Sequence, residues 1–510
     1  MKFTSVILMK ENASDSGSVR ASLEDTELIR RFLSQNPSGN EVFALVGELL
    51  ERIAALESEI EAIRKENLAL KKENLELREE NLELKRRLGL DSSNSSKPPS
   101  SDPPSMKYPR RTPTGKKPGK QKGDKGHRRQ FLTPTVIVDH RPDICRHCGA
   151  LIGEEVPATG DYQRRQQVEI PRVEPVVTER RYHAIRCPAC GKVNRAKPGE
   201  GEKKCYGPRL GALIAVLAMA HNLPRRHIEG ILGSVLGTRL SLGTIDNCLH
   251  EVGQAVEGPV EVLREGLAQQ PRLNIDESGW KKDGERRWIW TLVSPTVTFF
   301  HIAESRGKKV LEQILGDHFD GIIGSDRYGA YRAYDKAGWQ ICLAHLIREA
   351  KGLSESSDPI LSQFGLWVRD ELRLMIKLWK EGKAISLQMN SCKARLKRAC
   401  YLPHDSPDKH ARRFANAILK DWEAVTLFTK VEGIPPTNNL AEQSLRQSVI
   451  ARKISFGNHS ETGLRSTERL RTIIATAKMR GIDTWSYLAD ALNQYRTGQP
   501  VSPLQNSTTW

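Results

Sequence analysis

Three acidic side chains in the second half of the chain are of the type needed for phosphodiester chemistry. Asp276 and Asp326 each follow a short apolar run that predicts a strand, and Glu442 lies early in a predicted helix. Carboxylate oxygens are preferred ligands of hard divalent cations, and two Mg²⁺ (or Mn²⁺) ions can drive an in-line displacement at phosphorus. We therefore interpret these acids as candidate catalytic metal ligands, provided that the fold brings them together.

Each acid also has a simpler explanation. Aspartates at strand ends often form turns. Glu442 stands three residues after Asn439, which is the spacing of a capping box, and the two roles are compatible. Glu277 and Glu432 are alternative acids, but Glu277 should point to the opposite face of its strand from Asp276, and Glu432 precedes a double proline.

The segments around the acids predict a ribonuclease-H-like mixed sheet. Three consecutive strands followed by alternating helix and strand is the order expected of that architecture, whose central strands carry acids to one edge. We expect the catalytic domain to consist of 268–350 and 435–495, with a helical insertion at 351–434. Its strands are predicted at 272–276, 287–294, 297–303, 321–326 and 340–343, with a helix near 309–315.

Basic residues near these acids are candidate contacts for a phosphate backbone. Arg446 is one helical turn after Glu442, and Arg452 and Lys453 lie in the next segment, 451–463. A simple ion pair is an equally good explanation of Arg446. His345 and Arg348 are expected near the same sheet edge, with a core or surface role for His345 left open.

Two Cys-x-x-Cys pairs predict a structural zinc site in 131–205. Each pair is followed by glycine, and two such turns can complete a tetrahedral sulfur shell with no open catalytic position. The segments 166–170 and 175–186 are predicted strands that would bring the pairs together as a ribbon. The predicted Zn²⁺ ligands are Cys145, Cys148, Cys187 and Cys190.

The segment 206–265 predicts a small helical module. Helices are expected at 210–221, 225–236 and 242–252, with Ser241 capping the third. Short helices with tight turns fit a helix-turn-helix that reads DNA, although any small helical bundle gives the same pattern. Candidate phosphate contacts are Arg225, Arg226 and Arg239.

A heptad repeat in 40–90 predicts a coiled coil. Asparagine recurs in one seam column, where it favours two parallel strands and fixes register. A homodimer is therefore expected, with higher oligomers and a single surface helix as alternatives. One seam column is Leu49, Leu56, Ile63, Leu70, Leu77 and Leu84, and the other is Ile53, Ile60, Asn67, Asn74, Asn81 and Leu88.

The composition favours a nucleic-acid partner. The 510 residues carry a formal charge of +17, and part of that charge is concentrated in a predicted flexible linker at 91–130, where Lys116, Lys117 and Lys120 could track phosphates. A plain linker is the alternative. Nine cysteines and no long apolar run predict a cytoplasmic protein with no membrane partner, and binding to DNA would make it nucleoid-associated. A bacterial source is expected, although composition does not establish it.

The chain resembles the DDE transposases of the insertion-sequence-sixty-six group. The resemblance implies that Asp276, Asp326 and Glu442 hold the catalytic metal. Ser278 stands where the family often has threonine, and Leu343 where relatives tend to have tryptophan. The resemblance is carried by the segment from Asn94 to Ser100, both cysteine pairs, Asp276-Glu-Ser, Ser325-Asp-Arg-Tyr-Gly-Ala-Tyr, Cys342-Leu-Ala-His345, Asn438-Asn-Leu-Ala-Glu442-Gln-Ser-Leu-Arg446, Ala451-Arg-Lys and Phe456-Gly.

This resemblance implies a multidomain α+β and α/β enzyme that binds the ends of its mobile element and catalyses metal-dependent strand cleavage and transfer. The expected partners are the terminal inverted repeats, target DNA, a second copy of the chain and accessory proteins encoded by the element. Two alternatives stay open. One is a non-catalytic, zinc-containing, dimeric DNA-binding regulator, and the other is a ribonuclease-H-like nuclease without strand transfer.

Overall fold

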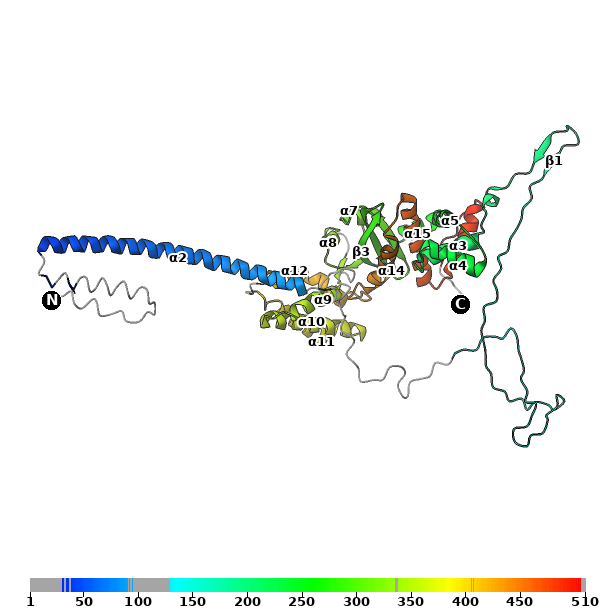
Figure 1. The fold of residues 1–510 in the computed structure, drawn as a ribbon, viewed down its shortest axis with the longest axis horizontal. Coiled ribbons are helices and arrows are strands. Elements are labelled where there is room, and N and C mark those ends of the chain that lie inside the picture. Colours follow the sequence, from blue (N-terminus) through cyan, green and yellow to red (C-terminus); the bar gives the residue numbers. More distant parts are fainter. Residues whose placement is uncertain are drawn as a thin grey trace. The chain divides into compact units, whose positions relative to one another are not determined.

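The computed structural model describes residues 30–31, 34–35, 38–89, 91, 94, 129–334, 338–404, 406 and 408–505. The chain forms two compact units, Met1–Gly89 and Leu90–Trp510 (Figure 1). Most of the predicted linker, including Lys116, Lys117 and Lys120, lies outside the described residues. No helix in the described part of the chain has the length and apolarity needed to cross a bilayer.

The first unit contains one long helix, α2 (Gly39–Gly89). The helix begins after Ser38, whose amide and hydroxyl both donate to the Glu41 carboxylate, at 2.8 and 2.7 Å. Six seam side chains of the described part are about half exposed, which is unusual for their type, with Leu56 and Ile63 each 49 % accessible. The predicted helix is confirmed, and its pairing with a second chain stays a prediction.

The second unit is built around a five-stranded mixed sheet. The strand order is β5-β4-β3-β6-β7, with β3–β4 and β4–β5 antiparallel and β3–β6 and β6–β7 parallel. The β3–β4 hairpin turns through Asp283 and Gly284, both at positive φ, as a tight two-residue connection requires. The strands are β3 (Arg272–Lys282), β4 (Glu285–Val293), β5 (Thr298–Ala303), β6 (Ile322–Ser325) and β7 (Gly338–Ile341).

Strand alternation divides the sheet into two differently covered faces. Ile275 and Trp290 face one large core, whereas Trp280 and Ile289 face a smaller cluster. The smaller cluster is closed by α14 (Asn439–Ser455) and α15 (Glu461–Met479), and Asp276 shares the alternation of Trp280, so it points toward the α14 side. The large core includes α7 (Lys308–Leu315), which follows β5, while the short α8 (Gly329–Ala333) follows β6.

The predicted helical module is confirmed as helix and shares the large core. Its helices are α3 (Pro208–Met219), α4 (Arg225–Leu236), α5 (Leu242–Ala255) and α6 (Glu257–Glu265), which pack with α16 (Thr484–Arg496). The Ser241 hydroxyl accepts from the Thr244 amide at 3.2 Å, which is the predicted cap. Gly237 ends α4 with φ +64°.

The helical insertion has a core of its own. Its helices α9 (Leu343–Ser354), α10 (Pro359–Lys380), α11 (Leu387–Ala399), α12 (Lys409–Lys420) and α13 (Trp422–Thr426) enclose Phe364 and Phe414. The predicted boundary at 351 lies inside α9. Gly365 permits the close approach of α9 and α10, since a Cβ there would lie 2.3 Å from the Ser354 amide nitrogen.

Most of the cysteine segment forms no regular secondary structure. Its strands are β1 (Ala184–Arg186) and β2 (Val193–Arg195), which pair antiparallel around the second Cys-x-x-Cys turn. The strand predicted at 166–170 is not formed, and the one predicted at 175–186 is formed only at its end. The apolar side chains of these segments stay in solvent, with Ile170 78 % and Val176 95 % exposed, so no hydrophobic face holds strands there together.

Candidate active site

The pairing of β3 with β6 brings Asp276 and Asp326 into the same part of the sheet. Asn274 on β3 pairs with Gly324 on the parallel neighbour β6, and each aspartate is two residues further along its chain. Asp276 lies within β3 and Asp326 is the first residue after β6, and the charge of Asp326 is among those that raise the pKa of Asp276, so the two carboxylates are neighbours. Cys342 extends this edge, since its amide donates to the Ser325 carbonyl at 2.8 Å.

Asn438 fastens the start of α14 to this edge. Its Nδ2 donates to the Ile275 carbonyl at 2.7 Å, and its Oδ1 accepts from Asn274 Nδ2 at 2.9 Å. Its amide also donates to Cys342 Sγ at 3.1 Å. Asn438 is fully buried, and Glu442 follows it by one helical turn, so these bonds bring the third acid to the part of β3 that carries Asp276.

The Glu442 carboxylate meets basic groups on α9. Its Oε1 accepts from Arg348 Nη2 at 3.0 Å and lies 3.5 Å from His345 Nδ1. The capping-box interpretation is wrong in this structure: the cap residue is Asn438 rather than Asn439, and it has no side-chain cap bond. The carboxylate therefore points across to α9 instead of back along its own helix.

The acids repel one another. Burial, followed by the charges of Glu277, Glu442 and Asp326, raises the pKa of Asp276 well above its usual value. One Asp276 oxygen accepts from the Glu277 amide at 2.9 Å, and one Asp326 oxygen accepts from the Tyr328 amide at 2.9 Å. Concentrated, partly compensated negative charge of this kind fits a divalent cation, which would relieve the repulsion.

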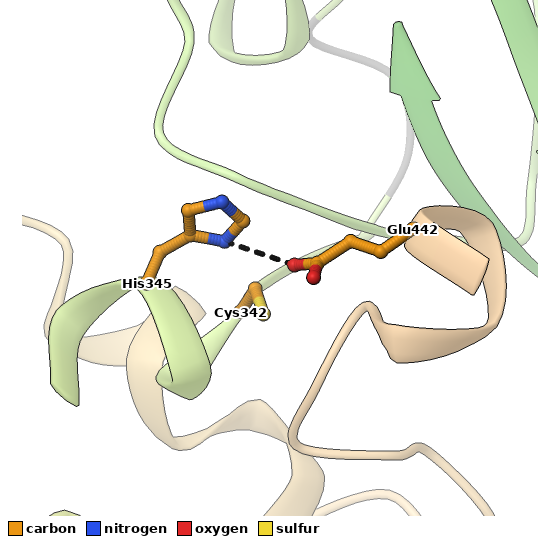
Figure 2. Close-up of side chains that lie close together, drawn as sticks. All are labelled: Cys342, His345 and Glu442. Carbon is orange, nitrogen blue, oxygen red and sulfur yellow. Dashed lines mark ion pairs between the residues drawn. The ribbon is translucent and has the colours of Figure 1, made fainter. Parts of the chain in front are cut away.

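The tightest group of metal-ligand side chains in the described residues is Cys342, His345 and Glu442 (Figure 2). Their ligand atoms all lie within 4.8 Å of one another, and Asp276 and Asp326 are outside this group. A two-metal site does not need such compactness. Two Mg²⁺ about 4 Å apart, each with ligands at about 2.1 Å, accommodate oxygens up to roughly 8 Å apart.

Burial affects Cys342 and His345 in opposite directions. It raises the pKa of the Cys342 thiol to about 11, so the thiol is protonated at neutral pH. Burial, helped by Arg348 and Arg327, lowers the pKa of His345 to about 3. The imidazole is therefore neutral, and its 3.5 Å approach to Glu442 is a contact rather than an ion pair.

The two alternative acids, Glu277 and Glu432, lie in different surroundings. Glu277 points to the opposite face from Asp276, as predicted, where Arg306 Nε donates to its carboxylate at 2.6 Å and the Tyr331 hydroxyl also donates. Burial is the main cause of the raised pKa of Glu277. Glu432 is exposed. Neither acid shares the edge of Asp276 and Asp326.

The predicted phosphate contacts differ in their availability. Arg225 pairs with Asp246 at 2.7 Å, and Arg452 donates to the Gly279 carbonyl and to Ser278 Oγ. Both guanidiniums are therefore already bonded to groups of the protein. Four others are exposed: Arg226 on α4, Arg239 just after α4, and Arg446 and Lys453 on α14. The ion pair considered for Arg446 is not formed with any described residue.

The two Cys-x-x-Cys segments each form a turn, separately from one another. Gly149 and Gly191 take φ +74° and +69°, and the amides of His147 and Cys148 point at Cys145 Sγ, which lowers the pKa of that thiol. The amides of Cys190 and Ala189 act likewise on Cys187. The four sulfurs are not gathered into one group in the described chain, and the shared zinc site stays a prediction.

Sequence reasoning did not assign roles to the residues that position the site. Asn274, Asn438 and Cys342 were not given a function, although Cys342 and Asn438 lie in motifs that were singled out. The usable signal was the double asparagine ahead of a helix whose fourth residue is acidic. An asparagine side chain has both a donor and an acceptor, so at a helix start, where backbone groups lack partners, it can bond to a neighbouring element.

Comparison with known proteins shows which family the chain belongs to. A model described as "Transposase IS66 family" matches residues 203–466, and one described as "Family of unknown function (DUF6444)" matches residues 34–130. The uncharacterized protein y4qI of Sinorhizobium fredii (strain NBRC 101917 / NGR234) is 25 % identical over 407 residues, covering 72 % of this chain and 74 % of that protein. The uncharacterized protein y4hP of the same strain is 22 % identical over 417 residues, covering 73 % and 74 %. Because the first model spans more than half of the chain and includes both aspartates and Glu442, the protein belongs to the IS66 family of transposases.

Proposed function

We propose that this transposase family member cuts and joins DNA strands by DDE-type chemistry, with Asp276, Asp326 and Glu442 as the metal ligands. The observation that carries the proposal is the pairing of Asn274 on β3 with Gly324 on β6, each of which stands two residues before one of the aspartates. Asn438 then supplies the link that brings Glu442 to the same edge. The strand order agrees with the ribonuclease-H-like arrangement expected for such enzymes.

The acids would bind and orient divalent cations. Bound Mg²⁺ or Mn²⁺ activates the attacking oxygen and stabilises the leaving oxygen. Water attack at an element end would break one phosphodiester bond and release a 3′-hydroxyl. That hydroxyl would attack a target phosphodiester and release a new 3′-hydroxyl there, with no covalent protein intermediate. Arg348 and Glu442 would separate when metal binds, which would free the guanidinium for phosphate.

The remaining parts of the chain suit DNA handling. We infer that exposed Arg226, Arg446 and Lys453, together with Lys116, Lys117 and Lys120, contact phosphates of the terminal repeats and target DNA. We further infer a structural Zn²⁺ at the four knuckle cysteines and a parallel homodimer through α2. A cytoplasmic, nucleoid-associated location and element-encoded accessory proteins are part of the same proposal, and the relatives are bacterial.

The test is cleavage and strand transfer in vitro with Mg²⁺ and candidate element ends. Asp276→Asn, Asp326→Asn and Glu442→Gln should each lower both rates at least about 100-fold, because loss even of an outer-shell partner costs 10- to 100-fold. Glu432→Gln, which changes an exposed acid, is the matched control. DNA binding in EDTA should be retained by all four variants.

The outcomes separate the alternatives. Binding of the repeats without cleavage by the wild-type protein, at any divalent metal, supports a non-catalytic regulator. Cleavage that never produces joined strands supports a nuclease. Cleavage that persists in Asp326→Asn would remove the DDE assignment.

A further inference from the structure

We propose that Cys342, His345 and Glu442 form a binding site for a soft divalent cation of the zinc class, distinct from the all-oxygen Mg²⁺ set. The three ligands come from two elements: Cys342 and His345 flank the start of α9, and Glu442 lies in the first turn of α14 (Figure 2). The site shares Glu442 with the proposed catalytic centre.

The geometry is close to that of a tetrahedral ion. Zinc–sulfur bonds of about 2.3 Å and zinc–nitrogen or zinc–oxygen bonds of about 2.0–2.1 Å put neighbouring ligand atoms roughly 3.3–3.8 Å apart. The three ligand atoms lie within 4.8 Å of one another, and Nδ1 and Oε1 are already 3.5 Å apart. Binding therefore requires a contraction of about 1 Å at the longest edge, which side-chain rotation can supply.

Backbone amides gather around the Cys342 sulfur. The Asn438 amide donates to Cys342 Sγ at 3.1 Å, and the amides of Ala344 and His345 also point at this sulfur. The Ala344 and His345 amides belong to the first turn of α9, and the His345 amide also donates to the Cys342 carbonyl at 3.3 Å. Amide donors of this kind also surround the sulfurs of Cys145 and Cys187 in the predicted zinc knuckles. The Cys342 sulfur thus shares its amide surroundings with the knuckle sulfurs, and a cation that binds here would displace the thiol proton.

The histidine has an unused nitrogen on the inside of the cluster. His345 Nδ1 is buried, points at the Glu442 carboxylate (Figure 2) and has no hydrogen-bond partner in the described structure. A buried polar atom without a partner costs about 1–3 kcal/mol, which is a reason to expect a ligand there. An ion at this position would take the lone pair of the neutral imidazole.

The donor set selects the metal. Thiolate and imidazole favour Zn²⁺ over Mg²⁺, which takes oxygen ligands and keeps its waters. Thiolate and carboxylate together neutralise a divalent ion, which is needed because Arg348 and Arg327 lie close to His345. Arg348 must leave Glu442 Oε1, or the ion must use Oε2. The fourth position stays open for water.

Occupation of this site would have a consequence for catalysis that rests on the proposed function. Zn²⁺ bound through Glu442 would remove that carboxylate from the Mg²⁺ pair. Zinc would therefore inhibit strand cleavage in competition with Mg²⁺. Binding itself does not depend on any activity of the protein, so the two statements are tested separately.

The binding test compares zinc content in full-length protein. Wild type and Cys342→Ala are stripped with chelator, reloaded with Zn²⁺, desalted and analysed for metal per chain. Cys400→Ala is the matched control, since Cys400 is another buried cysteine, in the insertion core away from this cluster. We expect Cys342→Ala to hold one zinc fewer than wild type and Cys400→Ala to match wild type. Any zinc at the knuckle cysteines is common to all three proteins and cancels.

A second variant and a second probe guard against misfolding. His345→Gln should lose the same equivalent, and Co²⁺ loading should show weaker sulfur-to-cobalt absorption in Cys342→Ala than in wild type. Circular dichroism checks that each variant is folded. Equal zinc in wild type and a folded Cys342→Ala or His345→Gln overturns the proposal. If binding is confirmed but no Mg²⁺-dependent cleavage is found in any protein, the failure belongs to the proposed function and not to this site.

Discussion

Replacement of Asn438 tests whether one side chain holds the third acid in place. Asn438→Ala deletes two buried hydrogen bonds and leaves the Ile275 carbonyl and Asn274 Nδ2 without partners. Each stranded group costs about 1–3 kcal/mol, so the free energy of unfolding should fall by about 2–6 kcal/mol. That is a large part of the roughly 5–15 kcal/mol that stabilises a typical domain.

Urea unfolding of the full chain, followed by tryptophan fluorescence, measures this loss. Asn439→Ala is the control, since its side chain is exposed and adjacent, and it should change stability by less than about 0.5 kcal/mol. A double-mutant cycle with Asn274→Ala should give a coupling energy of about 0.5–3 kcal/mol, because the two amides are bonded directly. Strand cleavage by Asn438→Ala should also fall without denaturant, because Glu442 is no longer held beside β3.

The reasoning would be refuted by an Asn438→Ala protein that unfolds within about 0.5 kcal/mol of the Asn439→Ala control. A coupling energy near zero would show that the hydrogen bond between Asn274 on β3 and Asn438 before α14 does not stabilise the fold. Normal stability with lost cleavage would instead assign Asn438 to the chemistry and not to positioning.

Three further predictions concern charge, packing and assembly. Asp276→Asn should raise the melting temperature of the metal-free protein at pH 7. Because the pKa of the Asp276 carboxyl is raised in the folded state, the stability of the wild type falls as the pH rises above the unfolded-state pKa near 4. Below that pH the variant and the wild type should melt at the same temperature. Gly365→Ala should cost at least about 1–3 kcal/mol in urea unfolding through overpacking, whereas Gly230→Ala, with open space at its Cβ, should be neutral or stabilising by up to about 1 kcal/mol. Ile63→Lys with Leu70→Lys should convert the full chain to monomer in sedimentation equilibrium, and an already monomeric wild type would contradict the coiled coil.

The central sheet could be predicted because its strands carry their own pattern. Leu273 and Ile275 alternate with polar Asn274 and Asp276, and this alternation fixes which side chains share a face. The end of the hairpin was marked by Asp283-Gly284, and the cap of α5 by Ser241. Such features depend on neighbours along the chain, so a single sequence contains them.

Features set by distant contacts were not predictable in the same way. The direction of the Glu442 carboxylate depends on Arg348 and His345, which belong to another element. Spacing to Asn439 alone therefore suggested a capping box that does not form. The strands expected near 166–170 had apolar residues but no partner surface, and an isolated strand is not stable in water.

The helical insertion illustrates how a remote acid can still be positioned accurately. Cys342 and Asn438 are 96 residues apart along the chain, yet the Asn438 amide donates to the cysteine sulfur. The Leu343 amide likewise donates to the Pro436 carbonyl at 2.9 Å, so the insertion leaves and rejoins the sheet at one place. For a flexible loop of that length, closure would cost about 4 kcal/mol beyond a constant. The insertion avoids much of this cost by folding on its own core, from Ile341 to Ile434, which brings its two ends together before Glu442 is reached. Changes inside that core should therefore alter stability first, and should alter the site only when they separate Leu343 from Pro436.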